Sequence, residues 1–221
     1  MTTRDEARER LAAALLGQPD LIISGGMCLC TVRRDDLRAL LSDHPRPSVS
    51  EDQGASQKMP KYTPLALANA FLSRHGNEGG IDHMKLQKLV YYAYGWWLAY
   101  EAEPLLTEGP ELWKHGPVFS SLYSALATRR SIRISAPQQA SPFSPPPMVP
   151  EDDQQTNGLI DWVWGRYGQF GAFALSDMTH AKGTPWQIEA ERQGYRVAQH
   201  HRIPDALISE CFKKEAEKLA S

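Results

Sequence analysis

The chain has 221 residues, 42% hydrophobic and 23% charged, which is the composition of a globular protein with one sizeable domain plus an appendage, or two small domains. Its 24 basic and 26 acidic residues leave a formal net charge of −2, so the whole chain has no strong attraction to nucleic acid or an anionic membrane. No apolar run approaches the roughly 18 residues of a membrane-spanning helix, and the charged start MTTRDEARER is unlike a secretory signal, so we expect a cytoplasmic protein without a membrane partner.

Residues 1–44 are predicted to form a small α/β module. A short helix stops at Gly17, two apolar β-type runs flank the hairpin signal Gly25-Gly26, and a second short helix ends before Pro45. A piece of about 45 residues is marginal for an independent core, so we expect it to pack on the rest of the chain or to be loosely ordered. Residues 45–61 are rich in Pro, Ser, Gln and Asp and are predicted to be a linker.

Residues 62–221 are predicted to form the main domain. Thr63 and Pro64 begin a first helix, and Asp82 is the expected N-cap of a helix over residues 83–101. The apolar band of this second helix is wide, which is typical of a helix buried on most of its circumference. A short strand is expected at residues 111–114, and Pro117 is expected to open the next helix.

The later part of this domain begins with a proline-rich insertion near residues 137–150. Six prolines there exclude a helix or a central strand, so an exposed loop is expected. Further helices are predicted within residues 156–170, before His180, from Pro185 onward, and within residues 203–220. The predicted fold class is therefore mainly α: a compact helical domain with a few short strands, preceded by the small α/β N-terminal module.

Six of the ten residues from Tyr91 to Tyr100 are aromatic, and three interpretations of this density were compared. A stacking platform for nucleic acid or a ligand pocket is disfavoured, because the run lies on a helix with little positive charge around it. Packing in the core accounts for most of the rings. Tyr91, Tyr92 and Trp96 either face the interior or form part of a surface that another protein contacts, since Tyr and Trp are favoured interface anchors.

Few residues suggest chemistry. Cys28 and Cys30 lack two further ligands at zinc-site spacing and are better explained as small buried side chains, so no metal, cofactor or catalytic residue is predicted. A hydrolase or nuclease using His115 and His180 is the alternative, but capping and backbone satisfaction explain these residues better than a catalytic triad does. A nucleic-acid-binding regulator would use Arg129, Arg130 and Arg133, a weak basic footprint at a helix end.

Four ordered blocks of sequence resemble a known family. They are MKLQKLVYYA, the pair Pro104-Leu105, LWKHGPVFSSLY, and MTHAKGTPW. Together they resemble the Panacea domain of SocA-like antitoxins, also described as a phage-associated GepA-like domain, over roughly residues 62–219. The residues predicted to be partner-binding or family-signature positions are Lys85, Gln87, Lys88, Tyr91, Tyr92, Trp96, Trp113, Lys114, His115, Gly116, Pro117, Thr179, His180, Pro185 and Trp186.

The resemblance implies a non-enzymatic, mostly helical antitoxin from a bacterial or prophage toxin–antitoxin system. Its partner would be a cognate protein toxin, neutralised by direct protein–protein contact. Some members of such a family act as adaptors that deliver the toxin to a ClpXP-type protease, and the sequence leaves open whether this chain does so or blocks its toxin sterically. A homo-oligomer is also left open, and residues 1–44 are expected to be a partner-specific addition.

Overall fold

The computed structural model describes residues 60–77, 79–129, 132–196 and 200–220. The predicted N-terminal module and almost all of the predicted linker lie outside these residues, as does Arg130. Within the described ranges the domain is mainly helical, with seven α helices and one two-stranded hairpin, as the sequence predicts. None of these helices combines the length and the apolar character needed to cross a membrane.

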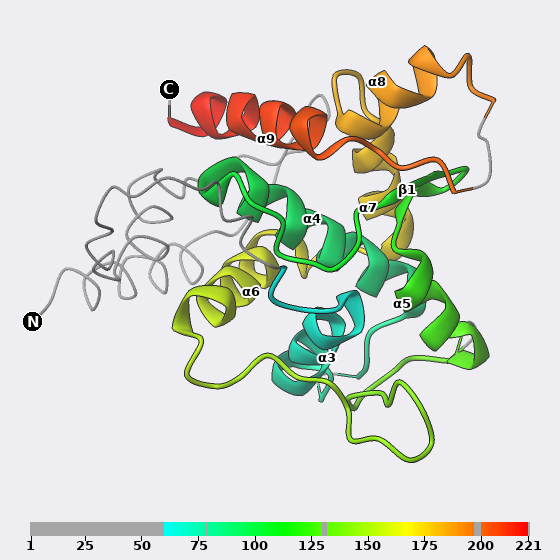
Figure 1. Ribbon diagram of the computed structural model, residues 1–221, viewed down its shortest axis with the longest axis vertical. Helices are drawn as coiled ribbons and strands as arrows, with labels where there is room; N and C mark the ends of the chain where they lie inside the picture. Colours follow the sequence, from blue (N-terminus) through cyan, green and yellow to red (C-terminus); the bar gives the residue numbers. More distant parts are fainter. Residues whose placement is uncertain (1–59, 78, 130–131, 197–199, 221) are drawn as a thin grey trace, which may run out of the picture.

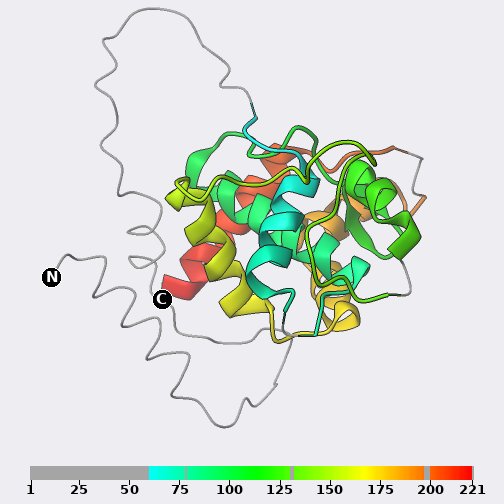
Figure 2. The same cartoon turned by 90° about the horizontal axis from the view of Figure 1, so that it is seen from below.

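Helix α4 (His83–Glu101) runs through the centre of the domain (Figure 1). Around it pack α3 (Pro64–His75), α6 (Gln154–Tyr167), α7 (Ala172–His180) and α9 (Asp205–Ala220). Seen from below, α3 lies between α6 and the helix that follows the hairpin (Figure 2). The prediction of a helix buried around most of its circumference is confirmed, because α3, β2, α5, α6, α7 and α9 all pack against it.

The starts of these helices follow local capping rules. The Thr63 hydroxyl accepts a hydrogen bond from the Ala66 amide and Pro64 occupies the first turn of α3, while the Asp82 carboxylate accepts one from the Lys85 amide at the start of α4. Each cap satisfies an amide that the helix itself leaves without a partner. Both predicted helix starts are therefore confirmed.

The hairpin pairs β1 (Glu111–Trp113) with β2 (Gly116–Val118) in antiparallel register, with Leu112 opposite Pro117. The prediction that Pro117 opens a helix is wrong, because Pro117 lies in β2 and the next helix, α5 (Ser120–Ala125), begins three residues later. The Leu112 amide points away from β2 and donates to the His201 carbonyl at 2.7 Å. Pro117 therefore occupies a non-hydrogen-bonded position, where its missing N–H costs nothing.

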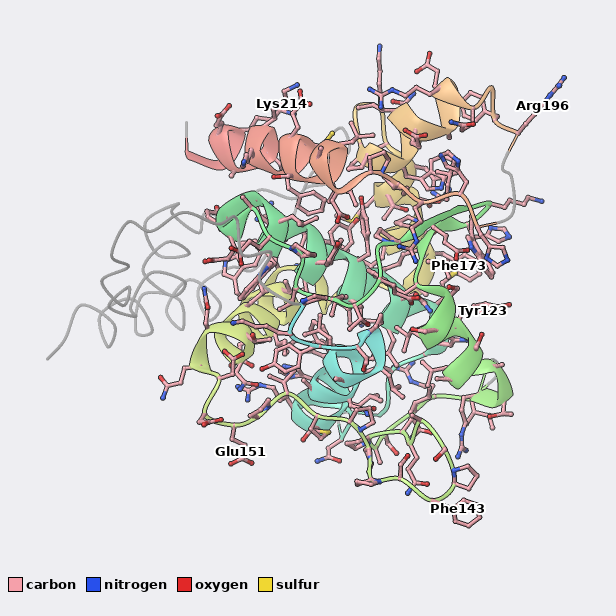
Figure 3. All side chains as sticks on the ribbon, viewed as in Figure 1. Tyr123, Phe143, Glu151, Phe173, Arg196 and Lys214 are labelled. Atoms are coloured by element: carbon pink, nitrogen blue, oxygen red, sulfur yellow. The ribbon has the colours of Figure 1, made fainter. Side chains whose placement is uncertain are left out.

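Two shorter helices complete the described fold, namely η1 (Ala127–Arg129) after α5 and α8 (Pro185–Arg192) after α7. The start of α8 at Pro185, capped by Thr184, agrees with the prediction. The proline-rich residues 137–150 form an irregular loop whose Phe143 is 98% exposed at its tip (Figure 3). Buried Asn69 of α3 anchors this loop with hydrogen bonds to its backbone, as both donor and acceptor.

The aromatic residues of α4 face the interior. Tyr91, Tyr92 and Trp96 are 2%, 7% and 0% exposed. The Tyr92 ring stacks on Tyr167 of α6 at 4.0 Å, and Trp96 meets Phe212 of α9 edge-on at 5.2 Å. In this structure the three rings are mostly packed in the core, and Tyr92 also lines a groove described below.

Candidate functional site

Most of the signature residues meet around the hairpin, starting with Gln87 on α4. Its amide nitrogen donates to the Phe119 carbonyl at 3.2 Å, and its amide oxygen accepts from the Phe119 N–H at 3.0 Å. This pair of bonds imitates a strand partner for the residue that follows β2 and satisfies both backbone groups in a buried place. Gln87 therefore fixes the end of the hairpin to the central helix.

Lys88 lies next to it and is 1% exposed. Its Nζ donates to the Pro117 carbonyl at 3.1 Å, the one hydrogen-bond acceptor that the described residues provide. Burial lowers the pKa of Lys88 to about 7, because the charged ammonium loses its hydration. Burying an amine that has one carbonyl partner costs free energy when the amine is charged. The stability of the contact between the hairpin and α4 should therefore depend on the charge of Lys88.

Gly116 is the point at which the hairpin approaches α4 and α7 most closely. Its φ of +97° is a conformation that glycine adopts without strain. A Cβ atom there would lie 2.5 Å from both the Lys88 Nζ and the Thr179 Oγ1. The sequence Gly116-Pro117 therefore combines a turn that requires glycine with a close contact that excludes any side chain.

Helix α7 holds the turn of the hairpin from the other side. The Ser176 hydroxyl donates to the His115 carbonyl at 3.0 Å. The two ring nitrogens of His180 lie 2.6 Å from the Ser176 carbonyl and 3.2 Å from the Lys114 carbonyl. Thr179 is buried and donates to the same Ser176 carbonyl. His180 thus reaches the main chain of the hairpin turn, while the hydrogen bond of Thr179 stays within α7.

Trp113 and Trp186 link β1 to α8. The Trp186 indole N–H donates to the Trp113 carbonyl, and the Trp113 indole N–H donates to Glu111, both at 2.8 Å. Burial alone would raise the pKa of Glu111, but hydrogen bonds from Trp113, Ser120 and His200 hold it below its ordinary value. Pro185 places Trp186 in the first turn of α8, with its ring against the His180 imidazole at 3.9 Å.

Four predicted site residues lie away from this hairpin cluster. Lys85 donates to the Gly168 carbonyl at the end of α6, with its Nζ 5.0 Å from the Trp164 ring, and burial lowers its pKa. Tyr91, Tyr92 and Trp96 form the aromatic core described above.

The other predicted site residues form the hairpin cluster. Among them, only Lys114 and His115 are exposed.

The hairpin cluster has the geometry of a structural support. Both ring nitrogens of His180 face carbonyl oxygens, so neither is directed at a nucleophile as a general base must be. The guanidinium of Arg133, named in the nucleic-acid alternative, donates to the carbonyls of Gly79 and Gly80. Ser176 and Glu111 were not among the predicted signature residues. Glu111 precedes Trp113 by two residues on the same face of a strand, the one local signal that could have found it.

A separate groove of about 390 Å³ opens between the end of α6, the turn from α7 to α8, and α9. Its walls include Phe170, Met178, Ile188 and Phe212, together with the predicted residues Tyr92 and Pro185. Arg166 also lines it, and no sequence motif pointed to that residue. The fold and its two sites thus define a helical scaffold with a braced hairpin and an apolar groove.

Comparison with known proteins identifies this scaffold. The family described as "Antitoxin SocA-like, Panacea domain" matches residues 86–187, the span that holds the entire hairpin cluster. Antitoxin SocA of Caulobacter vibrioides (strain NA1000 / CB15N) is 29% identical over 156 residues, which are 67% of this chain and 81% of that protein. No solved structure matches. Residues 86–187 of this chain thus match the Panacea domain of SocA-like antitoxins.

Proposed function

We propose that this chain is an antitoxin that neutralises a cognate protein toxin in the bacterial cytoplasm by binding it directly, without catalysing a reaction. The observation that carries the proposal is its similarity to Antitoxin SocA, which extends over 81% of that relative. A toxin encoded beside the antitoxin, on a chromosome or a prophage, is the expected partner. Residues 1–44 would contribute to the choice of that toxin.

The geometry of the signature residues supports a binding role. Gln87, Lys88 and Thr179 are buried, and Gln87 and Lys88 contact the main chain of the hairpin segment, while His180 has both ring nitrogens on carbonyl oxygens. Such contacts hold the hairpin segment in one conformation, and a protein that acts by binding another protein needs a surface of fixed shape. The hydrolase alternative receives no support, because both ring nitrogens of His180, its proposed base, face main-chain carbonyl oxygens.

Co-expression tests the proposal. Each short open reading frame next to this gene is induced in a host cell, with this chain or with the same gene carrying an early stop codon. We expect one product to arrest growth, growth to return only with the intact chain, and the two proteins to co-purify. If no neighbouring product is both toxic and rescued, the chain is not the antitoxin of an adjacent toxin and the proposal fails.

The same cells distinguish the two modes of neutralisation. Steric inhibition leaves the toxin present at its usual level in a stable complex. Delivery to a ClpXP-type protease lowers the toxin level when this chain is expressed, and deletion of the protease restores both the toxin level and the growth arrest. Gel filtration of the chain alone and of the complex reports whether a homo-oligomer forms.

A further inference from the structure

The groove between α6, α7, α8 and α9 has properties that the hairpin cluster does not use. Its floor is apolar and aromatic, formed by residues such as Phe170, Met178, Ile188 and Phe212. It lies partly on α9, beyond the span of the Panacea match. A concave apolar site of several hundred Å³ can accept a few side chains of a peptide segment.

Arg166 is the unusual residue of this groove. It is 9% exposed, and its Nη1 atom is buried without a hydrogen-bond partner among the described residues. Its Nε donates to the Tyr167 hydroxyl at 3.3 Å, and its guanidinium lies 5.6 Å from the Tyr167 ring centroid. No carboxylate in the described part of the chain forms an ion pair with it. A buried cation in this situation strongly favours an anion that approaches from outside.

The charges around Arg166 favour the same kind of ligand. The groove is also lined by Lys182, Lys214 and Lys218, against one carboxylate, that of Glu215. Glu215 Oε2 lies 3.8 Å from the Lys218 ammonium, while its Oε1 is buried without a hydrogen-bond partner among the described residues. Lys214 points outward from α9 at the rim, where it pairs with Glu210 at 2.6 Å (Figure 3), so Lys182 is the lysine of the groove for which the described residues show no ion pair. The groove therefore combines an apolar floor with a positive rim and a buried guanidinium.

We propose that this groove binds a segment of the partner protein in which apolar side chains flank a carboxylate, and that this carboxylate pairs with Arg166. The inference rests on the proposed function, since the toxin is the partner that would supply the segment. The carboxylate belongs to an Asp or Glu side chain or to the C-terminus of the toxin. Arginine binds a carboxylate through two parallel N–H donors, and the free Nη1 provides one of them.

Protection of Cys211 tests where the partner binds. Cys211 lines the groove and is a free thiol; burial raises its pKa, so alkylation is performed at about pH 8.5. The probe is the purified toxin identified by co-expression, and the Cys211 peptide is followed by mass spectrometry. We expect alkylation at least about tenfold slower in the complex. The control is Phe143→Cys, at the exposed loop tip far from α9, whose alkylation rate should not change (Figure 3).

Arg166→Gln tests the chemistry of binding, with Arg192→Gln as the control because Arg192 is exposed on α8 and does not line the groove. We expect Arg166→Gln to weaken toxin binding at least about tenfold and Arg192→Gln to leave it unchanged. Should Arg166→Gln fail to fold, Ile188→Asp places a competing negative charge in the half-buried wall and should weaken binding in the same way.

The outcomes separate this inference from the proposed function. If the toxin binds the unmodified chain but neither protects Cys211 nor responds to these substitutions, the groove proposal is wrong and the antitoxin proposal stands. If no toxin binds at all, both fail. Protection that increases with the concentration of the chain alone would assign the groove to a second copy. A Cys211 that is already unreactive in the free, full-length chain would indicate that the chain covers the groove itself; either result overturns the proposal.

Discussion

Replacement of Lys88 by methionine should remove a large pH dependence from the stability of the domain. Burial places the pKa of Lys88 near 7 in the folded chain, against an ordinary value of 10.5. The unfolded chain therefore binds more protons between these two values, so the free energy of unfolding rises with pH in this window and falls as the pH drops toward 7. Compared with a lysine whose pKa is the same in the folded and unfolded chain, Lys88 lowers the free energy of unfolding by an amount on the order of 4 kcal/mol at pH 7 and about 2 kcal/mol at pH 9.

Lys88→Met keeps a long unbranched side chain and removes the charge. Its cost is that the buried Pro117 carbonyl loses its hydrogen bond, about 1–3 kcal/mol, which is smaller than the cost of the buried charge at pH 7. We therefore expect Lys88→Met to be more stable than the natural chain at pH 7, by a margin that shrinks by about 2 kcal/mol at pH 9. The exposed Lys213→Met on α9 is the matched control and should change little at either pH.

Urea unfolding followed by tryptophan fluorescence at pH 7, 8 and 9 measures these differences, since Trp96 and Trp162 are buried. The range stops at pH 9 because burial also raises the pKa of the core tyrosines Tyr91 and Tyr92 above the ordinary value of 10.0. Those groups and Cys211 are present in all variants and cancel in the comparison. Parallel stability curves for the natural chain and Lys88→Met would refute the reasoning, since the lysine would then hold its charge equally in both states.

Three further substitutions test the contacts of the hairpin, of the core and of the proline-rich loop, the first two by the same unfolding measurement and the third by proteolysis. Gln87→Leu leaves the buried Phe119 N–H without a partner, while the Phe119 carbonyl keeps its hydrogen bond from the Tyr123 amide, and should cost about 1–3 kcal/mol; no measurable loss would mean that water replaces the amide. Gly95→Ala places a methyl group 2.4 Å from the Phe212 ring and should cost about 1–3 kcal/mol, whereas Gly158→Ala, which meets no atom within 4 Å, should stabilise α6 slightly; equal effects would contradict the close helix contact. Asn69→Leu should release the loop of residues 137–150, detected as cleavage within that loop by a protease that leaves the natural chain intact.

Local signals in the sequence were sufficient to predict the helices. Thr63 and Asp82 are N-caps in the structure as predicted, and α8 begins at Pro185 as predicted, because a helix start depends on residues within one turn of it. Pro117 is a position at which local signals did not predict the correct secondary structure. A proline fits both the first turn of a helix and an unpaired strand position, and the choice was made by the pairing of β1 with β2 and by the contact of β1 with His201.

The aromatic run of α4 was ambiguous for a related reason. Its own periodicity shows more apolar surface than one face can bury, but it does not show what covers the remainder. Phe212 lies 116 residues after Trp96 (212 − 96), and Tyr167 lies 75 residues after Tyr92 (167 − 92), so both covering rings come from helices distant in the sequence. Gly95 is the local signal of this contact, since the absence of its side chain leaves the space that the Phe212 ring occupies.

The hairpin cluster and the groove differ in what their polar groups contact, and this difference predicts where partner choice resides. Gln87 and Lys88 contact main-chain atoms, so their interactions are independent of any partner. Arg166 and Lys182 line the groove, where the side chains of a partner would meet them. Substitutions in the first group act through folding and should change the binding of every partner in the same direction. Substitutions in the second group leave the scaffold in place, so we expect them to change the affinity for one toxin while another, with a differently charged segment, is still bound.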